Sequence, residues 1–201
     1  MAGALLSIVA LVVMILKAAT TTASPLAITA VIVFGMSMIL LYSASATYHM
    51  VIAKDHVIEF LRRLDHSMIY VLIAGTYTPF CLITLNGVTG WVLFSIIIAA
   101  AVSGVVFKMV WFHCPRWLST ALYLLLGWMI VFVISPLAGS ISTAGIVLLV
   151  LGGLSYTIGG VIYGIKPKFL KSKYMGYHEI FHIFILLGTL AHFLSVYLFV
   201  I

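Results

Sequence analysis

Long apolar runs alternate with short polar connections along the whole chain, and this pattern predicts membrane-spanning helices. Seven runs approach or exceed the length needed to cross about 30 Å of hydrocarbon. Lipid offers backbone amides no hydrogen-bonding partner, so such runs are expected to be helical. The sequence therefore predicts an all-α, seven-transmembrane helix bundle with spans at Ala2–Leu16, Ala27–Ile52, Ser67–Leu85, Gly90–Phe112, Trp117–Leu137, Ile141–Tyr163 and His178–Ile201.

The composition agrees with a membrane protein, since 65% of the 201 residues are hydrophobic and only 7% are charged. Few soluble domains keep so little charge on their surface. We therefore expect a multi-pass protein of the cell inner (plasma) membrane. The connections are brief and contain no soluble segment or repeat, so one domain is expected over residues 1–201. The first span is short, begins at Met1 and lacks the leader of a signal peptide, which favours a truncated helix.

The basic residues predict the orientation, because cytoplasmic loops are enriched in Lys and Arg. Of the 10 basic residues, only Lys17 lies on the side opposite the others. This predicts a cytoplasmic N-terminus and an external C-terminus. This topology and attraction to anionic lipid together account for the net charge of +6, so nucleic-acid binding is not needed to explain it. The cytoplasmic residues are Lys54, Arg62, Arg63, Lys108, Arg116, Lys166, Lys168, Lys171 and Lys173.

Two histidines four residues apart, His178 and His182, open the last span. Side chains at i and i+4 project from one helix face, so both imidazoles can bind a single Zn²⁺. Polar groups at membrane depth are functional by default, which favours metal binding over simple packing.

Three further polar residues are expected at the same depth under the predicted orientation. Ser45 and His49 share one face near the cytoplasmic end of span two, and Asp65 stands at the entrance of span three. Three imidazoles with an open fourth position are typical of catalytic zinc. Asp65 is then a candidate general base, and Ser45 a candidate to orient a ligand or stabilise an oxyanion.

Each of these residues also has a structural interpretation. Asp65 could neutralise Arg62 or Arg63, or cap the start of span three. Ser45 could bond its own backbone or allow close helix packing. His66 is a weaker candidate for the site. His192 lies too far along the last span for the same ion and is expected to bond a neighbouring helix.

The glycines, a proline and the two cysteines predict how the helices pack, where the backbone bends and whether a disulfide forms. Gly159, Gly160 and Gly164 predict close helix packing, and Pro79 predicts a kink. Cys81 and Cys114 lie on opposite sides of the predicted membrane and cannot form a disulfide.

The run His178-Glu179-Ile180-Phe181-His182 also matches the H-E-x-x-H pattern of zinc proteases, in which Glu is the general base. Intramembrane proteases of the site-2 type carry this motif in an early span, with a metal-binding Asp downstream. Here the motif is in the last span and Asp65 precedes it, so a protease is the less favoured interpretation.

Five segments of the chain form a distinctive combination: Ser45-Ala46-Thr47-Tyr48-His49, Arg63-Leu64-Asp65-His66, Ala74-Gly75-Thr76-Tyr77-Thr78-Pro79-Phe80, Tyr177-His178-Glu179-Ile180-Phe181-His182 and Ala191-His192-Phe193. Together they resemble the bacterial hemolysin III family, within the superfamily of progestin and adipoQ receptors, adiponectin receptors and alkaline ceramidases. The resemblance covers all seven spans. It implies a cytoplasmic N-terminus and a zinc ion held by His49, His178 and His182, with the family Asp at Asp65 and the family Ser at Ser45.

The resemblance implies three functions that the sequence leaves open. The ceramidases and adiponectin receptors imply zinc-dependent hydrolysis of a lipid amide, with membrane lipid as the substrate. The name hemolysin implies membrane permeabilisation. A lipid sensor or receptor with a structural zinc ion is the third alternative. We take the zinc-dependent amide hydrolase as the leading hypothesis.

Overall fold

The computed structural model describes residues 2–111, 113–167 and 176–201, except for the side chain of His178. Seven helical stretches in these residues are long and apolar enough to cross a membrane, which confirms the all-α, seven-span prediction. Lys168, Lys171 and Lys173, which support the predicted orientation, lie outside the described residues. The chain forms two compact units, Met1–His113 with Val200–Ile201 and Cys114–Phe199, and each is described by itself. The single domain stays a prediction.

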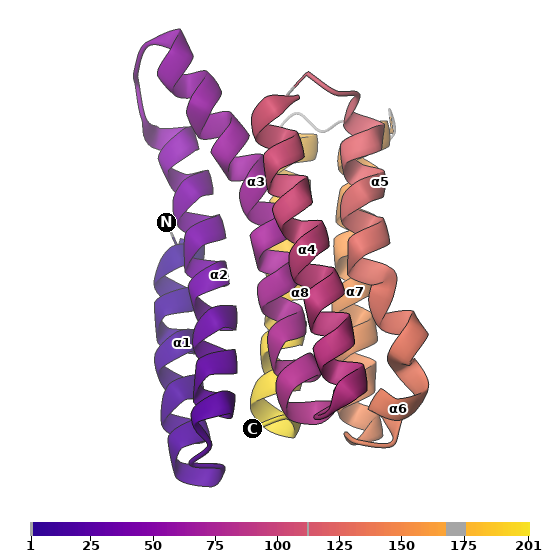
Figure 1. Cartoon of the computed structure of the whole chain (residues 1–201). Helices are drawn as coiled ribbons and strands as arrows, with labels where there is room; N and C mark the ends of the chain where they lie inside the picture. The colour runs from indigo at the N-terminus through magenta and orange to yellow at the C-terminus, as the bar shows by residue number, and fades with distance from the viewer. Residues whose placement is uncertain (1, 112, 168–175) are drawn as a thin grey trace. The chain divides into compact units, whose positions relative to one another are not determined.

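Unit 1 contains α1 (Ala2–Thr21), α2 (Pro25–Met50), α3 (Asp55–Pro79), the π-helical turn η1 (Phe80–Thr84) and α4 (Val88–Val110). Consecutive helices pack on one another, α1 on α2, α2 on α3 and α3 on α4 (Figure 1). The Ser24 side chain accepts a hydrogen bond from the backbone N–H of Ala27, and Pro25 follows it, a typical helix start.

Two predicted helix boundaries in unit 1 are wrong, because polar residues extend helices beyond the apolar runs. α1 continues past Leu16 to Thr21, whose hydroxyl donates to the backbone oxygen of Lys17 at 2.7 Å. α3 begins at Asp55, well before Ser67. Its first turns contain an ion pair between Glu59 and Arg63, four residues apart, a spacing that stabilises a helix.

The end of α3 changes from α-helix to π-helix directly after Pro79. Proline cannot donate a backbone hydrogen bond, and kinks and π turns are common at such positions. A π-helical turn therefore follows the residue at which the kink was predicted, and the kink itself stays a prediction. Close by, Gly90 of α4 lies against the backbone oxygen of Cys81, where a side chain would clash.

Unit 2 contains α5 (Arg116–Gly127), the 3₁₀ segment η2 (Trp128–Val133), α6 (Ile134–Ala138), α7 (Thr143–Ile165) and α8 (Tyr177–Phe199). The span predicted as continuous from Trp117 to Leu137 is interrupted. The ring of Pro136 would clash with the carbonyl four residues earlier in an α-helix, so a tighter 3₁₀ segment precedes it. The Trp128 indole N–H donates to the Thr157 hydroxyl at 3.0 Å, which holds the interruption against α7.

The glycines of α7 form two packing faces, which confirms the close packing predicted for Gly159, Gly160 and Gly164. Gly160 and Gly164 contact Thr120 of α5. On the other face, three glycines spaced by seven residues contact α8, in the pairs Gly145 with Phe199, Gly152 with His192 and Gly159 with Phe184. Small residues at helix interfaces let membrane helices approach closely.

Candidate metal and catalytic site

α2 and α3 bring together three of the five predicted site residues within unit 1. Ser45 is buried, with 7% of its surface exposed, and His49 lies one turn further along α2. The Ser45 hydroxyl donates a hydrogen bond to the Asp65 carboxylate, and His49 interacts with the same carboxylate electrostatically. A serine, a histidine and a carboxylate from two helices therefore form one polar cluster, which we call the Asp65 cluster.

Asp65 does not stand at a helix entrance, because α3 begins at Asp55. Its side chain is buried, with 8% of its surface exposed. The alternative in which Asp65 caps the start of the span is therefore wrong. A buried carboxylate is costly unless it is hydrogen-bonded, and Ser45 supplies such a bond. The alternative in which Ser45 bonds only its own backbone is wrong as well.

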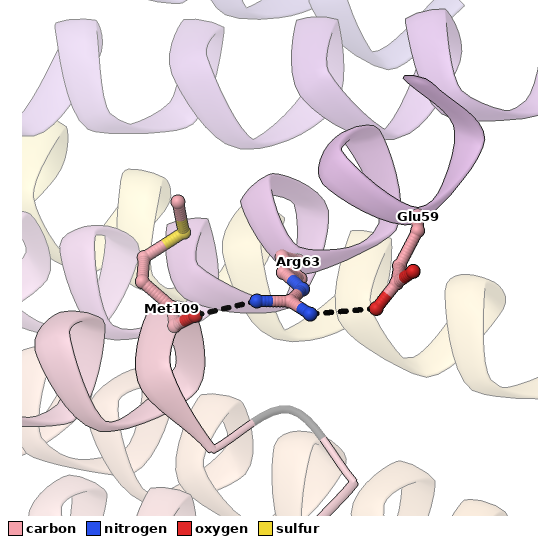
Figure 2. A network of polar contacts seen from close by, with 3 residues as sticks. All are labelled: Glu59, Arg63 and Met109. Carbon is pink, nitrogen blue, oxygen red and sulfur yellow. Dashed lines mark hydrogen bonds and ion pairs between the residues drawn. The ribbon is translucent and has the colours of Figure 1, made fainter. Parts of the chain in front are cut away.

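Arg63, one of the two arginines that Asp65 could neutralise, forms an ion pair with Glu59 at 2.6 Å. Its second terminal nitrogen donates to the backbone oxygen of Met109, near the end of α4, at 2.8 Å (Figure 2). Arg62 and His113 also lie within electrostatic reach of Glu59. This link between α3 and α4 was not predicted from the sequence, where the spacing of Glu59 and Arg63 is its one signal.

The remaining two predicted ligands lie on α8 in unit 2. His182 is half-buried, and its ring centroid lies 5.8 Å from that of Phe181. His178 lies in the first turn of α8, but its side chain is outside the described residues. Glu179, the acidic residue of the H-E-x-x-H pattern, is exposed in the same turn.

Among the described side chains, no group of three or more His, Cys, Asp or Glu residues is arranged to hold a metal ion. The side chain of His178 is not among the described side chains. His49 and Asp65 belong to unit 1, whereas His178 and His182 belong to unit 2. The zinc ligands and the catalytic residues stay predictions.

Two further histidines, His66 and His192, have structural partners. The Nδ1 atom of His66 lies 2.7 Å from the backbone oxygen of Arg62 in its own helix. The Nε2 atom of His192 lies 3.1 Å from the backbone oxygen of Leu149 in α7. This confirms that His192 bonds a neighbouring helix. Cys81 and Cys114 are both buried and are not joined by a disulfide.

A family model described as Haemolysin-III related matches residues 1–193. The chain belongs to this family. Among the curated members, Hemolysin-3 of Bacillus cereus is 42% identical over 202 residues, which cover 99% of this chain and 87% of that protein. The Hemolysin-3 homolog of Bacillus subtilis (strain 168) is also 42% identical, over 194 residues that cover 96% of this chain and 87% of that protein. The chain is a multi-pass membrane protein of the haemolysin-III family, as its motifs predict.

Proposed function

We propose that this haemolysin-III protein is a zinc-dependent hydrolase of lipid amides that acts near the cytoplasmic leaflet. The Asp65 cluster is the observation that carries the proposal. Ionisable residues inside membrane spans are rare and functional by default. Here the buried carboxylate is held by the Ser45 hydroxyl and accompanied by a histidine, which are the groups that acid–base chemistry on a water molecule requires.

The donor set fits Zn²⁺ chemically. His49, His178 and His182 would hold the ion, because imidazole nitrogens are preferred zinc ligands. A carboxylate has about four acceptor sites, so Asp65 can accept from Ser45 and still bind a water molecule. When bound, Zn²⁺ would supply a Lewis acid that polarises the amide carbonyl and lowers the pKa of water toward about 7.

The residues of the chain would then perform the following steps. Asp65 orients the attacking water and accepts its proton, while Ser45 keeps the carboxylate in place. The water oxygen adds to the amide carbonyl carbon, and the carbon–nitrogen bond breaks. Asp65 returns the proton to the leaving nitrogen, so the products are a fatty acid and a free amine. The apolar helices solvate the acyl chain.

Membrane permeabilisation is the second candidate, because two relatives carry the names Hemolysin-3 and Hemolysin-3 homolog. A pore requires a polar-lined path through the membrane. In α3 two buried threonine hydroxyls beyond Asp65 bond their own helix, Thr76 to the backbone oxygen of Leu72 and Thr78 to that of Ala74. Hydroxyls that donate to the backbone of their own helix are poor lining for a water-filled path. Hydrolysis is therefore the better-supported function.

Metal analysis of the purified protein tests the ligand set. We expect wild type to contain zinc and His182→Ala to lose most of it. His66→Ala is the matched control, because the ring of His66 is bonded within its own helix, and it should retain zinc. A zinc content in His182→Ala equal to that of wild type would reject the assigned ligands.

Release of fatty acid from ceramide-like lipids tests the reaction. General acid–base groups contribute about 10²- to 10⁴-fold, so Asp65→Ala should lower kcat by a factor in that range. Asp55→Ala, at the start of α3, is the control and should keep the wild-type rate. Equal rates for wild type and Asp65→Ala would remove the enzyme hypothesis. A wild type that contains zinc, does not hydrolyse lipid and releases dye from vesicles would favour permeabilisation; zinc with neither activity would favour a sensor.

A further inference from the structure

α3 is held on two different sides within unit 1. On the side that faces α2, Asp65 accepts from Ser45, and Gly75 lies close against the Ser37 side chain. On the side that faces α4, Arg63 bonds the Met109 backbone and Tyr70 lies close against Gly104. The rotation of α3 about its axis therefore depends on contacts with both neighbours.

Arg63 and Asp65 face opposite sides because they are two residues apart. Each residue turns an α-helix by about 100°, so their side chains diverge by about 200°. A contact that fixes Arg63 on α4 consequently fixes the direction in which Asp65 points. Rotating α3 by even a fraction of a turn would carry the carboxylate away from Ser45.

The contact of Arg63 is suited to fixing a helix. Its guanidinium donates through one nitrogen to the Met109 oxygen at 2.8 Å and through the other to Glu59 at 2.6 Å (Figure 2). Met109 lies in the last turn of α4, where carbonyls lack partners within the helix and the dipole favours a cation. The planar guanidinium fork makes both bonds in one defined geometry, which a lysine cannot do.

We propose that Arg63 is a positioning residue, which fastens α3 to the end of α4 and thereby presents Asp65 to Ser45 and His49 of α2. The consequence for hydrolysis rests on the proposed function, whereas the placement of Asp65 does not. The side chains of Arg63 and Glu59 are 30% and 39% exposed, and part-exposed pairs add little net stability. Loss of Arg63 should therefore disturb the position of Asp65 more than it disturbs folding.

The aspartates of this chain allow a direct measurement, because Asp55 and Asp65 are the only two. Full-length protein labelled with ¹³C at the aspartate carboxyl carbon and placed in lipid nanodiscs should give two carboxyl NMR signals. Asp55→Asn assigns them. Ser45→Ala then shows where the Asp65 signal lies without its hydroxyl donor.

Arg63→Gln should move the Asp65 signal toward its position in Ser45→Ala and leave the Asp55 signal unchanged. Arg63→Lys should move it part of the way, since an ammonium group satisfies one partner at a time. The matched control is Lys54→Gln, which removes one positive charge from an exposed side chain with no capping bond at the start of α3. Both signals should stay in place in this control.

An Asp65 signal at the wild-type position in Arg63→Gln would overturn the proposal. So would a shift of the same size in Lys54→Gln, because the cause would then be charge alone. If Arg63→Gln does not fold, Glu59→Ala and Arg63→Lys decide the question, and an unmoved Asp65 signal in both overturns it.

Kinetics separate this inference from the proposed function. If the protein hydrolyses lipid amides, Arg63→Gln should lower kcat by up to about 100-fold, the effect of misplacing a catalytic group by about 1 Å. Its zinc content and KM should stay near those of wild type. A shifted Asp65 signal in a protein that hydrolyses nothing would uphold the positioning role and reject the hydrolase.

Discussion

At the scale of single residues, the bond between Ser45 and Asp65 is the most informative contact in unit 1. A carboxylate in a membrane span must be compensated, and the Ser45 hydroxyl on the neighbouring helix does this. In the proposed mechanism the same bond orients the carboxylate toward the attacking water. Ser45 therefore has a structural role, which is to compensate the buried carboxylate, and a proposed functional role, which is to orient it.

Ser45→Ala should test the two roles together. Removing one partner of a buried hydrogen bond costs about 1–3 kcal/mol, so we expect the free energy of unfolding in detergent to fall by that amount. Lipid hydrolysis should fall as well. Ser43→Ala is the control, because position 43 points to the opposite side of α2 and should change neither quantity. Equal stability in the two variants would show that the bond contributes nothing.

At the scale of helices, α7 and α8 are joined by close glycine contacts and by hydrogen bonds along the same interface. Beside the contact of Gly152 with His192, the Ser195 hydroxyl donates to the backbone oxygen of Gly145 at 2.9 Å. The hydroxyls of Tyr156 and Thr189 lie 2.8 Å apart. Close approach permitted by the glycines allows these short side chains to reach across the interface.

Gly152→Ala and Gly153→Ala should differ sharply although they are neighbours. A β-carbon at position 152 would overlap the ring of His192, which must then move from the Leu149 oxygen. Overpacking of this kind costs about 1–3 kcal/mol, so thermal unfolding should begin at lower temperature. A β-carbon at position 153 would have no atom of another element within 4 Å. Alanine there should be neutral or stabilise the protein by about 0.5–1 kcal/mol. Similar losses in both variants would contradict the packing.

At the scale of the whole molecule, the orientation in the membrane is the prediction with the widest consequence, because it sets the leaflet from which a substrate would come. It depends on the distribution of Lys and Arg. The exposed residues Lys54 and Asn86 flank the third span, and its length places them on opposite sides of the bilayer.

Single-cysteine labelling tests the orientation. In a background with Cys81 and Cys114 replaced by alanine, Asn86→Cys should react with a membrane-impermeant thiol reagent on intact cells. Lys54→Cys should react only after the membrane is permeabilised. The reverse pattern would place the N-terminus outside and move the proposed site to the external leaflet.

Individual helices show where prediction from sequence succeeded and where it did not. The ends of α4 and α7 follow their apolar runs closely, because hydrophobicity alone decides which segments enter lipid. The start of α3 was misplaced, because charged residues end an apolar run without ending a helix. The interruption before Pro136 was missed, because apolar composition is the same in an α-helix and a 3₁₀ segment.

The sequence by itself determined the class of the molecule, the number of spans, the family and the candidate site residues. Each of these follows from residue type and local spacing. Only the tertiary structure decided which side chains meet. Ser45 reaches Asp65, and Arg63 bonds a carbonyl 46 residues away. Such contacts depend on the rotation and depth of packed helices, to which residues distant in sequence contribute, so no local pattern encodes them.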